Sequence, residues 1–564
     1  MTRFGTRLKH LGRRDYTAYF VLGIAFAFVC VFLIYPIFRT ILYAFVPKGA
    51  VTTPANFTIA NFAKFWTSTM YLRSLRNSLY IGLAVVGFTS LIGVPMGYLV
   101  ARVNIPFKRV ILTLGILPII MPAFVGAFSW IILLGRQGAL RLILQQIGIP
   151  LPPIYGPFGI IFTMSMMYYP FVFLLSHGAF ESANPQLEES AVTMGARLPR
   201  IIRTITLPLV LPSIAAGGIL VFVRAISNFG IPAIVGGNTY VLPTLIYFQV
   251  SGFWNLNAAA AISLISVAIT GIALWAQKSI VSKREYETIS VARSALKQHS
   301  RRSVRVFASI FCWAVLVISL LPQITLVVMS FFKSWYGLFP KGFTLEHYAA
   351  IPRYLIGPAT NSLLFATAGS LGAAAIGTLV AYIIQRRAPR GSAILDYAVM
   401  LPFILPGIVV AVALLTTFSS GPLILRGTYF IMLISFIIRR TPYVFRSVSA
   451  GLTQLDPSLE EASILSGATW FRTFRKITFP IILSTIIAGT MLTFVTLLTE
   501  LSTSILLYGP QTRTLAIVIY DQVKDGRFGS ASALSVLLFV LVIVVMYGLN
   551  RYSGKSVSSS FKMG

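Results

Sequence analysis

The sequence has few charged residues, and acidic ones are the scarcest. Asp, Glu, Lys and Arg make up 11% of its 564 residues, whereas 56% are hydrophobic. Soluble domains carry about 25% charged residues, so this composition excludes an ordinary soluble domain. Only 14 acidic residues stand against 46 basic ones, which gives a formal net charge of +32.

Side chains that bind metals or catalyse reactions are also scarce. The two cysteines, Cys30 and Cys312, lie in separate apolar runs without the spacing of a metal or redox pair, and the four histidines are scattered. No Gly-x-x-x-x-Gly-Lys-Ser/Thr phosphate-binding loop occurs, and no nucleophile–base pattern stands out. We therefore expect no catalytic residue, no metal site and no cofactor bound by this chain.

Long apolar runs fill most of the chain. Each approaches the ~20 residues that a helix needs to cross a bilayer core. The first run, 16–40, is too long for a signal-peptide core and has no small-residue cleavage site behind it. The runs are continuously apolar, unlike the alternating strands of a membrane barrel. Hydropathy predicts an all-α, polytopic membrane protein with spans at residues 16–40, 77–101, 109–134, 157–180, 206–227, 256–277, 305–332, 361–385, 393–418, 427–449, 478–500 and 530–550.

The position of the basic residues decides what the high net charge means. They gather beside the apolar runs: Arg3, Arg7, Lys9, Arg13 and Arg14 at the start, Lys278, Lys283, Arg284, Arg293, Lys297, Arg301, Arg302 and Arg305 in the central polar stretch, and Lys555 and Lys562 in the tail. Basic residues that flank spans face the cytoplasm and are attracted to anionic lipid headgroups. We expect contact with membrane lipid, no nucleic-acid partner, and both termini in the cytoplasm.

Some basic residues remain on the loops that this topology places outside, namely Arg136, Arg141, Lys341 and Arg353.

The two halves of the chain repeat each other. Asn77-Ser78-Leu79 recurs 284 residues later as Asn361-Ser362-Leu363, and Tyr169-Pro170 recurs 272 residues later as Thr441-Pro442. Six predicted spans separate the copies, so both copies have the same orientation in the membrane. The sequence predicts two parallel six-helix repeats, residues 1–277 and 305–564, joined by a basic cytoplasmic linker at 278–304. A transport pathway is expected at their interface.

Each half has one strongly patterned polar loop. The first runs from Asn184-Pro185 through Glu189-Ser190-Ala191 to Gly195, and the second from Asp456-Pro457 through Glu461-Ala462-Ser463 to Gly467. The pattern predicts a short helix that Asn184 or Asp456 caps and that the proline begins. Gly195 and Gly467 permit a turn after it. Small residues at 190, 191, 462 and 463 would let another protein approach closely.

These loops resemble the Glu-Ala-Ala…Gly loop of bacterial ABC-importer permeases, in which a coupling helix sits in a cleft of the ATP-binding subunit. The resemblance implies the type I importer transmembrane fold in the bacterial inner membrane. It assigns ATPase coupling to Glu189, Ser190, Ala191, Gly195, Glu461, Ala462, Ser463 and Gly467. It also implies two copies of an ATP-binding subunit, which hold the ATP and Mg²⁺, and one periplasmic solute-binding protein. A single loop could be a mere connection between helices, but two at a fixed offset favour the coupling function.

The fused layout is similar to the ferric-iron permease group. The resemblance rests on two stretches of sequence, Glu500-Leu501…Thr514-Leu515-Ala516…Ile519-Tyr520 and Asn228-Phe229-Gly230-Ile231-Pro232. Ferric iron or a small anion is the solute that this resemblance implies, with thiamine or a phosphonate as alternatives. From another class, an ion-coupled secondary transporter is the alternative, but the predicted spans hold few of the carboxylates that it would need.

Charged residues inside predicted spans are functional candidates because they are costly there. We select Arg224, Arg439, Arg440 and Glu500 among them, together with Asn228, which lies close to Arg224 in the sequence. Two interpretations stay open. These residues could line an electropositive translocation pathway for an anionic or carboxylate-chelated solute, or the arginines could pair with Glu500 and lock two helices together.

Overall fold

The computed structural model describes residues 16–282, 302–387 and 392–553. Most of the predicted linker at 278–304, the basic residues before position 16 and the tail beyond position 553 therefore lie outside the described residues. The described chain is almost entirely helical, as predicted. Its one small sheet pairs β1 (Phe332–Ser334) with β2 (Lys341–Phe343) in antiparallel fashion.

The longer helices form the body of the molecule. They are α1 (Tyr16–Val29), α2 (Tyr35–Ala44), α4 (Thr69–Arg102), α7 (Ala123–Leu134), α9 (Gly156–Ser182), α12 (Leu207–Ser227), α15 (Leu256–Ser282), α16 (Arg302–Ser330), α18 (Ile351–Tyr382), α19 (Ser392–Ile404), α20 (Gly407–Phe418), α21 (Tyr429–Gln454), α24 (Phe479–Leu498) and α27 (Phe528–Ser553).

Shorter helices connect them. They are α3 (Ala60–Thr67), α5 (Lys108–Leu114), α6 (Leu117–Ile120), α8 (Ala139–Gln146), α10 (Pro185–Thr193), α11 (Leu198–Ile201), α13 (Gly230–Val235), α14 (Leu242–Ser251), α17 (Glu346–Ala349), α22 (Ser458–Leu465), α23 (Trp470–Thr473), α25 (Ser504–Leu507) and α26 (Leu515–Lys524). A 3₁₀ turn spans Pro54–Asn56, and π-helical turns span Cys30–Ile34, Ile202–Thr206, Ile383–Arg387 and Phe474–Thr478.

Ten helical segments of the described chain are long and apolar enough to cross a membrane, or eleven if one bent pair counts as a span. Ten of the twelve predicted spans overlap these segments, and the bent pair covers the predicted span at 393–418. The predicted span at 427–449 is present as α21, which is long enough but carries Arg439, Arg440 and Arg446 and is not among the ten.

The predicted spans at 109–134 and 393–418 are both broken. The first consists of α5, α6 and α7, and the second bends by 111° between α19 and α20. Pro122 and Pro406 stand at these breaks with extended ψ angles of 134° and 142°. Proline disfavours a helical conformation in the residue before it. Repeated prolines thus mark the same break in both halves.

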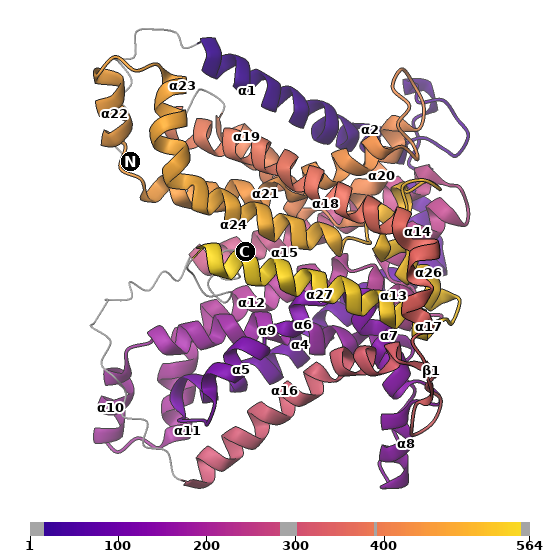
Figure 1. Cartoon of the computed structure of the whole chain (residues 1–564), viewed down its shortest axis with the longest axis vertical. Helices are drawn as coiled ribbons and strands as arrows, with labels where there is room; N and C mark the ends of the chain where they lie inside the picture. Colours follow the sequence, from indigo (N-terminus) through magenta and orange to yellow (C-terminus); the bar gives the residue numbers. More distant parts are fainter. Residues whose placement is uncertain (1–15, 283–301, 388–391, 554–564) are drawn as a thin grey trace.

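The first long helical segment of each half packs against the other half. Helix α16 packs on α4 and α7, and α2 packs on α20. The Tyr169 hydroxyl lies 3.1 Å from Ser319 Oγ, and Thr40 Oγ1 lies 3.2 Å from Thr416 Oγ1. Figure 1 shows the result, with α1 and α2 beside α18–α24 and α16 beside α4–α12. The halves are therefore interlocked.

Equivalent glycines bring two helices into close contact in each half. A Cβ atom on Gly93 of α4 would lie 2.8 Å from the backbone nitrogen of Phe173 in α9. A Cβ atom on Gly377 of α18 would lie 3.0 Å from the backbone nitrogen of Phe445 in α21. Small residues allow this close approach of membrane helices. The predicted repeat is therefore a structural one.

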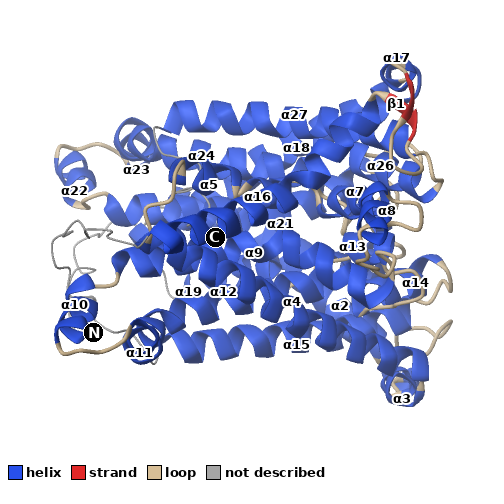
Figure 2. Ribbon diagram, turned by 90° about the horizontal axis from the view of Figure 1, so that it is seen from below, coloured by secondary structure: helices blue, strands red, loops and turns tan. Residues whose placement is uncertain are grey.

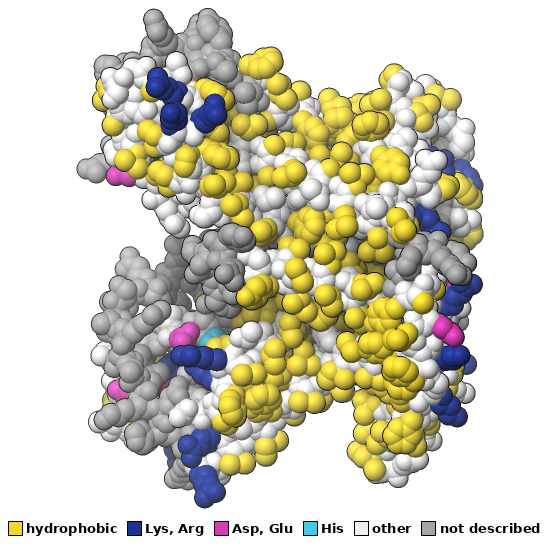
Figure 3. Space-filling view, in the orientation of Figure 1, with side chains coloured by type: hydrophobic (Ala, Val, Ile, Leu, Met, Phe, Trp, Pro, Cys, Tyr) yellow, Lys and Arg dark blue, Asp and Glu magenta, His cyan; other side chains and the backbone are white. Residues whose placement is uncertain are grey.

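The two ends of the helix bundle carry different elements. Helices α10, α11, α22 and α23 lie at one end, and α3, α14 and α26 lie at the other (Figure 2). We call them the α10–α22 end and the α14–α26 end. Apolar side chains cover much of the middle of the surface, and Lys and Arg gather toward the ends (Figure 3). Such a surface suits a bilayer core flanked by headgroups.

Candidate functional site

The two polar loops fold into helices α10 and α22, as the sequence predicted. Asn184 Oδ1 accepts a hydrogen bond from the Gln186 backbone N–H at 2.9 Å. Asp456 Oδ1 accepts one from the Ser458 backbone N–H at 3.0 Å, and α22 begins there, one residue later than expected. Both helices protrude from the same end of the molecule (Figure 2).

Gly195 and Gly467 end these helices in the same way. Each has a φ of +83°, in the left-handed region that glycine adopts readily. The Gly195 N–H donates to the Val192 carbonyl, and the next N–H, of Ala196, donates to the Ala191 carbonyl. The second loop has the same pair of bonds 272 residues later. This is a Schellman motif, which closes a helix with glycine at its turn.

Glu188 holds α10 against the membrane helices. Its Oε1 atom lies 3.0 Å from Arg102 Nη2 at the end of α4, and it accepts a 3.0 Å hydrogen bond from the Thr206 hydroxyl. Prediction from the sequence missed Glu188 and selected its neighbour Glu189. The signal was available, because Glu188, Arg102 and Thr206 all recur in the second half at the offsets of the repeat.

Glu460 is the equivalent residue in α22, and its anchor is more extensive. Glu460 Oε1 accepts a 2.7 Å hydrogen bond from Thr478 and lies 3.4 Å from Arg386 Nε. The Tyr382 hydroxyl donates to Glu460 Oε2 at 3.4 Å and accepts from Trp470 Nε1 at 3.0 Å. Glu460 is 8% exposed. Helices α10 and α22 are thus anchored in the same way but by different numbers of contacts.

The predicted coupling residues divide between two faces. Glu189, Ser190, Glu461 and Ala462 are exposed, whereas Ala191 and Ser463 are partly buried. Ser463 lies 2.9 Å from the Thr473 hydroxyl, so it faces its own chain and not a partner. Large apolar side chains complete the exposed face, namely Leu187, Val192, Met194, Leu459, Ile464 and Leu465.

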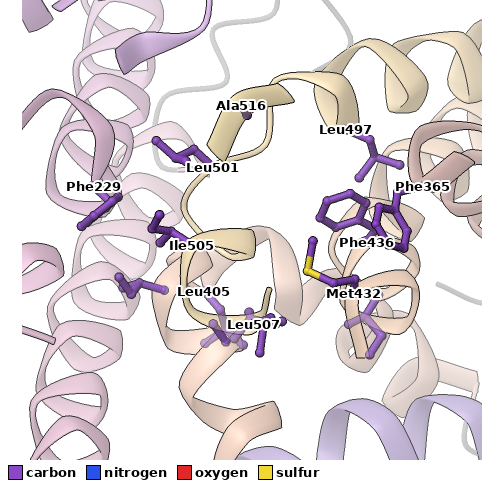
Figure 4. Close-up of a cluster of buried hydrophobic side chains, with 14 of the residues drawn as sticks. Phe229, Phe365, Leu405, Met432, Phe436, Leu497, Leu501, Ile505, Leu507 and Ala516 are labelled. Atoms are coloured by element: carbon purple, nitrogen blue, oxygen red, sulfur yellow. The ribbon is translucent and has the colours of Figure 1, made fainter. Parts of the chain in front are cut away.

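Apolar side chains join the two halves toward the α14–α26 end. Phe229 of the first half lies among Leu405, Leu501 and Ile505 of the second (Figure 4). Its ring also lies 6.1 Å from that of Tyr520. These buried apolar side chains form a direct contact between the two halves.

Arg439 and Arg440 both bind Glu500, next to this apolar contact. Arg439 Nη1 lies 2.6 Å from Glu500 Oε1, and Arg440 Nη2 lies 2.5 Å from Glu500 Oε2. Arg439 also donates to the Thr503 hydroxyl at 2.7 Å, and Arg440 to the Tyr443 hydroxyl at 3.4 Å. The ion pair between helices that the sequence suggested is therefore present.

The first half has an uncharged counterpart of this ion pair. Asn228 Nδ2 donates to the Tyr168 hydroxyl at 2.7 Å. Tyr168 precedes Arg440 by 272 residues, and Asn228 precedes Glu500 by the same number. Asn228 Oδ1 also accepts from the Ile231 backbone N–H at 2.9 Å. Asn228 is therefore a structural link in the first half, and the ion pair belongs to the second.

Arg224 is the charged residue that the first half contributes. Its guanidinium carbon lies 4.6 Å from the centre of the Phe171 ring, a cation–π distance. The same guanidinium lies close to the Tyr443 side chain of the second half. The structure thus brings Arg224, Arg439, Arg440 and Glu500 together around the seam between the halves.

The sequence matches the family model described as binding-protein-dependent transport system inner membrane component. The match covers residues 93–286 and again 373–559, more than half of the chain. The chain belongs to this family. It is the permease component of an ATP-binding-cassette importer and a multi-pass protein of the inner membrane; ATP hydrolysis resides in a separate subunit.

Several relatives resemble it over different lengths. A ferric transport system permease protein of Actinobacillus pleuropneumoniae is 27% identical over 495 residues, 84% of this chain and 70% of that protein. A protein of Salmonella typhimurium assigned to 2-aminoethylphosphonate transport is 28% identical over 241 residues, 42% of this chain and 89% of that protein. A bacterial importer of the polysaccharide alginate, solved by crystallography, is 19% identical over 48% of this chain and 97% of that chain, with a TM-score of 0.37.

Within the described ranges, no group of three or more His, Cys, Asp or Glu side chains is placed to hold a metal ion.

Proposed function

We propose that this permease imports ferric iron, which a periplasmic binding protein delivers to its α14–α26 end. The supporting observation is the relationship to two ferric permease proteins, which extends over 84% and 80% of the chain. Both halves take part in that similarity. The proposal places the α10–α22 end and both termini in the cytoplasm.

Two copies of one ATP-binding subunit would dock on the permease, one at α10 and one at α22. Two features support this stoichiometry. Each helix ends in the same Schellman turn, and each is anchored through an equivalent glutamate, Glu188 or Glu460. The ATP and Mg²⁺ would bind on those subunits, and this chain would bind no cofactor. The division at 1–277, 278–304 and 305–564 gives one docking helix to each half.

The mechanism would be a rocking of the two halves. ATP binding draws the two ATPases together, and the docked helices α10 and α22 follow. Because Glu188 and Glu460 tie these helices to α4 and α18, their movement passes into the membrane helices. The apolar contact around Phe229 would then open and admit the solute from the binding protein. ATP drives the cycle because it binds the two conformations of the complex with different affinities.

A phosphonate is the second candidate solute. It is favoured by the relatives assigned to 2-aminoethylphosphonate transport, which match the chain over 241 residues. It is further favoured by the arginines at the seam, since a phosphonate is an anion. Those relatives match only 42% of the chain, whereas the ferric permeases match 84% and 80%. Ferric iron is therefore the better supported solute.

Reconstitution in liposomes tests the proposal. The permease, its ATPase and its binding protein are purified together, and uptake of radioactive ferric iron or labelled 2-aminoethylphosphonate is measured with and without ATP. We expect ATP-dependent uptake of iron only. Uptake of the phosphonate alone would replace the first candidate with the second. Uptake that needs an ion gradient and no ATP would support an ion-coupled secondary transporter.

A further inference from the structure

Three guanidinium groups meet at the seam, but only one carboxylate opposes them. Arg440 donates to the Tyr443 hydroxyl, Arg224 lies close to the same side chain, and Arg439 and Arg440 both contact Glu500. In the contacts of the described chain, Glu500 is the carboxylate that these arginines share. It neutralises one of the three positive charges.

The arginines also keep donors that the protein does not use. The Nε atoms of Arg224 and Arg440 are buried and have no hydrogen-bond partner among the described residues. The side chains of Arg224, Arg439, Arg440 and Tyr443 are only partly buried. Unpaired charge within a membrane is costly and marks a pathway for a charged species.

The fold does not require these charges. In the first half, Met167, Tyr168 and Asn228 stand at the positions of Arg439, Arg440 and Glu500, and Tyr168 and Asn228 make a neutral hydrogen bond. Arg224 likewise corresponds to Thr496 in the second half. One repeat therefore reaches the same backbone arrangement without any ion pair, which leaves the excess positive charge without a structural purpose.

We infer that Arg224, Arg439 and Arg440 form a transient site for an oxyanion group of the solute, of the carboxylate or phosphate class. This rests on the proposed import function and adds that the cargo crosses as an anion or together with one. Planar guanidinium groups suit such groups because they donate paired hydrogen bonds. Because Arg224 comes from one half and Arg439 and Arg440 from the other, rocking of the halves would assemble and release the site.

The test uses the full chain in complex with its ATPase. The variants are Arg224→Gln, Arg224→Lys, and the triple variant Arg439→Met, Arg440→Tyr, Glu500→Asn, which copies the first half and so retains a pairing that this fold accepts. Arg446→Gln, an exposed arginine on the same helix α21, is the control. Thermal unfolding is followed with sodium orthophosphate or citrate against sodium chloride of equal ionic strength, and uptake of ferric iron from the loaded binding protein is measured in liposomes.

We expect orthophosphate or citrate to raise the unfolding midpoint of the unmodified chain, Arg224→Lys and Arg446→Gln, and to raise it less in Arg224→Gln and the triple variant. Uptake should fall roughly ten- to a hundredfold in those two, as for loss of a charged hydrogen bond. Equal shifts in all variants, or unchanged uptake in Arg224→Gln, would overturn the anion site. If orthophosphate or citrate raises the unfolding midpoint of the unmodified chain but the complex takes up no ferric iron, the anion site is supported. That result would contradict only the iron proposal.

Discussion

Asn228 and Glu500 occupy equivalent positions in the two halves, and each accepts a hydrogen bond from the backbone N–H three residues ahead. The distances are 2.9 Å to Ile231 and 3.1 Å to Thr503. The side chains then diverge, since Asn228 binds the Tyr168 hydroxyl while Glu500 binds two arginines. The repeated backbone therefore carries a neutral link in one half and a charged one in the other.

Replacing Gly195 and Gly467 with valine should uncouple ATP hydrolysis from uptake. A Cβ atom would meet nothing within 4 Å at either position, so no clash results. The φ of +83° costs an L-residue about 1–2 kcal/mol at each turn, which is enough to displace the exposed helix but not to unfold the bundle. Membrane insertion, ATPase activity and uptake are measured on the double variant.

Gly49→Val is the matched control for this strain. Gly49 has a φ of +85° with nothing within 4 Å, and it lies in the loop after α2, outside the coupling helices. It should keep hydrolysis and uptake coupled. Normal coupling in the Gly195/Gly467 double variant would show that these turns do not transmit the movement.

Glu460→Gln should lower the thermal unfolding midpoint of the purified chain more than Glu188→Gln does. Glu460 is held by three partners in a buried setting, and loss of its charge removes roughly 2 kcal/mol from charge-assisted hydrogen bonds. Glu188 is more exposed and has two partners. Glu461→Gln changes an exposed neighbour and should have no effect. Equal midpoints for the two anchor variants would refute the difference between the loops.

Valine at Gly93 or Gly377 should destabilise the permease by about 1–3 kcal/mol through overpacking. At each position a Cβ atom would lie within 3.0 Å of a backbone nitrogen of the neighbouring helix, which cannot move aside easily. Gly87 lies on the same helix as Gly93 and has nothing within 4 Å, so Gly87→Val should be tolerated. Unfolding midpoints and yields of folded protein in detergent decide the comparison. If Gly377→Val is tolerated, helices α18 and α21 of the second half do not pack as closely as α4 and α9 of the first.

Much of the fold could be predicted because its causes are local. Membrane helices need long apolar runs, so composition and run length sufficed for the all-α class and for most spans. The repeat was visible because matching residues such as Tyr169-Pro170 and Thr441-Pro442 fall at a constant offset. The same offset placed Gly195 and Gly467 at the ends of helices α10 and α22.

The broken spans could not be read from hydropathy, which averages over a window. Residues 393–418 are apolar apart from Asp396 and a few neutral polar residues, yet the chain bends by 111° after Ile404. Proline inside an apolar run often kinks a helix without breaking it, so Pro406 does not by itself predict this bend. Interlocking of the halves through α2 and α16 depends on contacts between distant segments, which a single sequence does not reveal.

The candidate site was predicted in its members but not in its grouping. Arg439, Arg440 and Glu500 were selected because charge in a span is rare, and their pairing was one of the two interpretations that the sequence left open. The link from Arg224 to Tyr443 joins the two halves, so it could not be inferred from spacing along one helix. Glu188 and Glu460 were passed over because each stands next to a glutamate that fits the coupling motif better.

One copy of this chain should supply both docking helices of the importer. Native mass spectrometry of the purified complex, extracted gently with its ATPase, tests this directly by counting subunits. We predict one copy of this chain with two copies of the ATPase, and one ATPase copy after the residues of α22 are replaced by a flexible linker of equal length. A complex with two permease chains, or one ATPase on the unmodified chain, would contradict the claim.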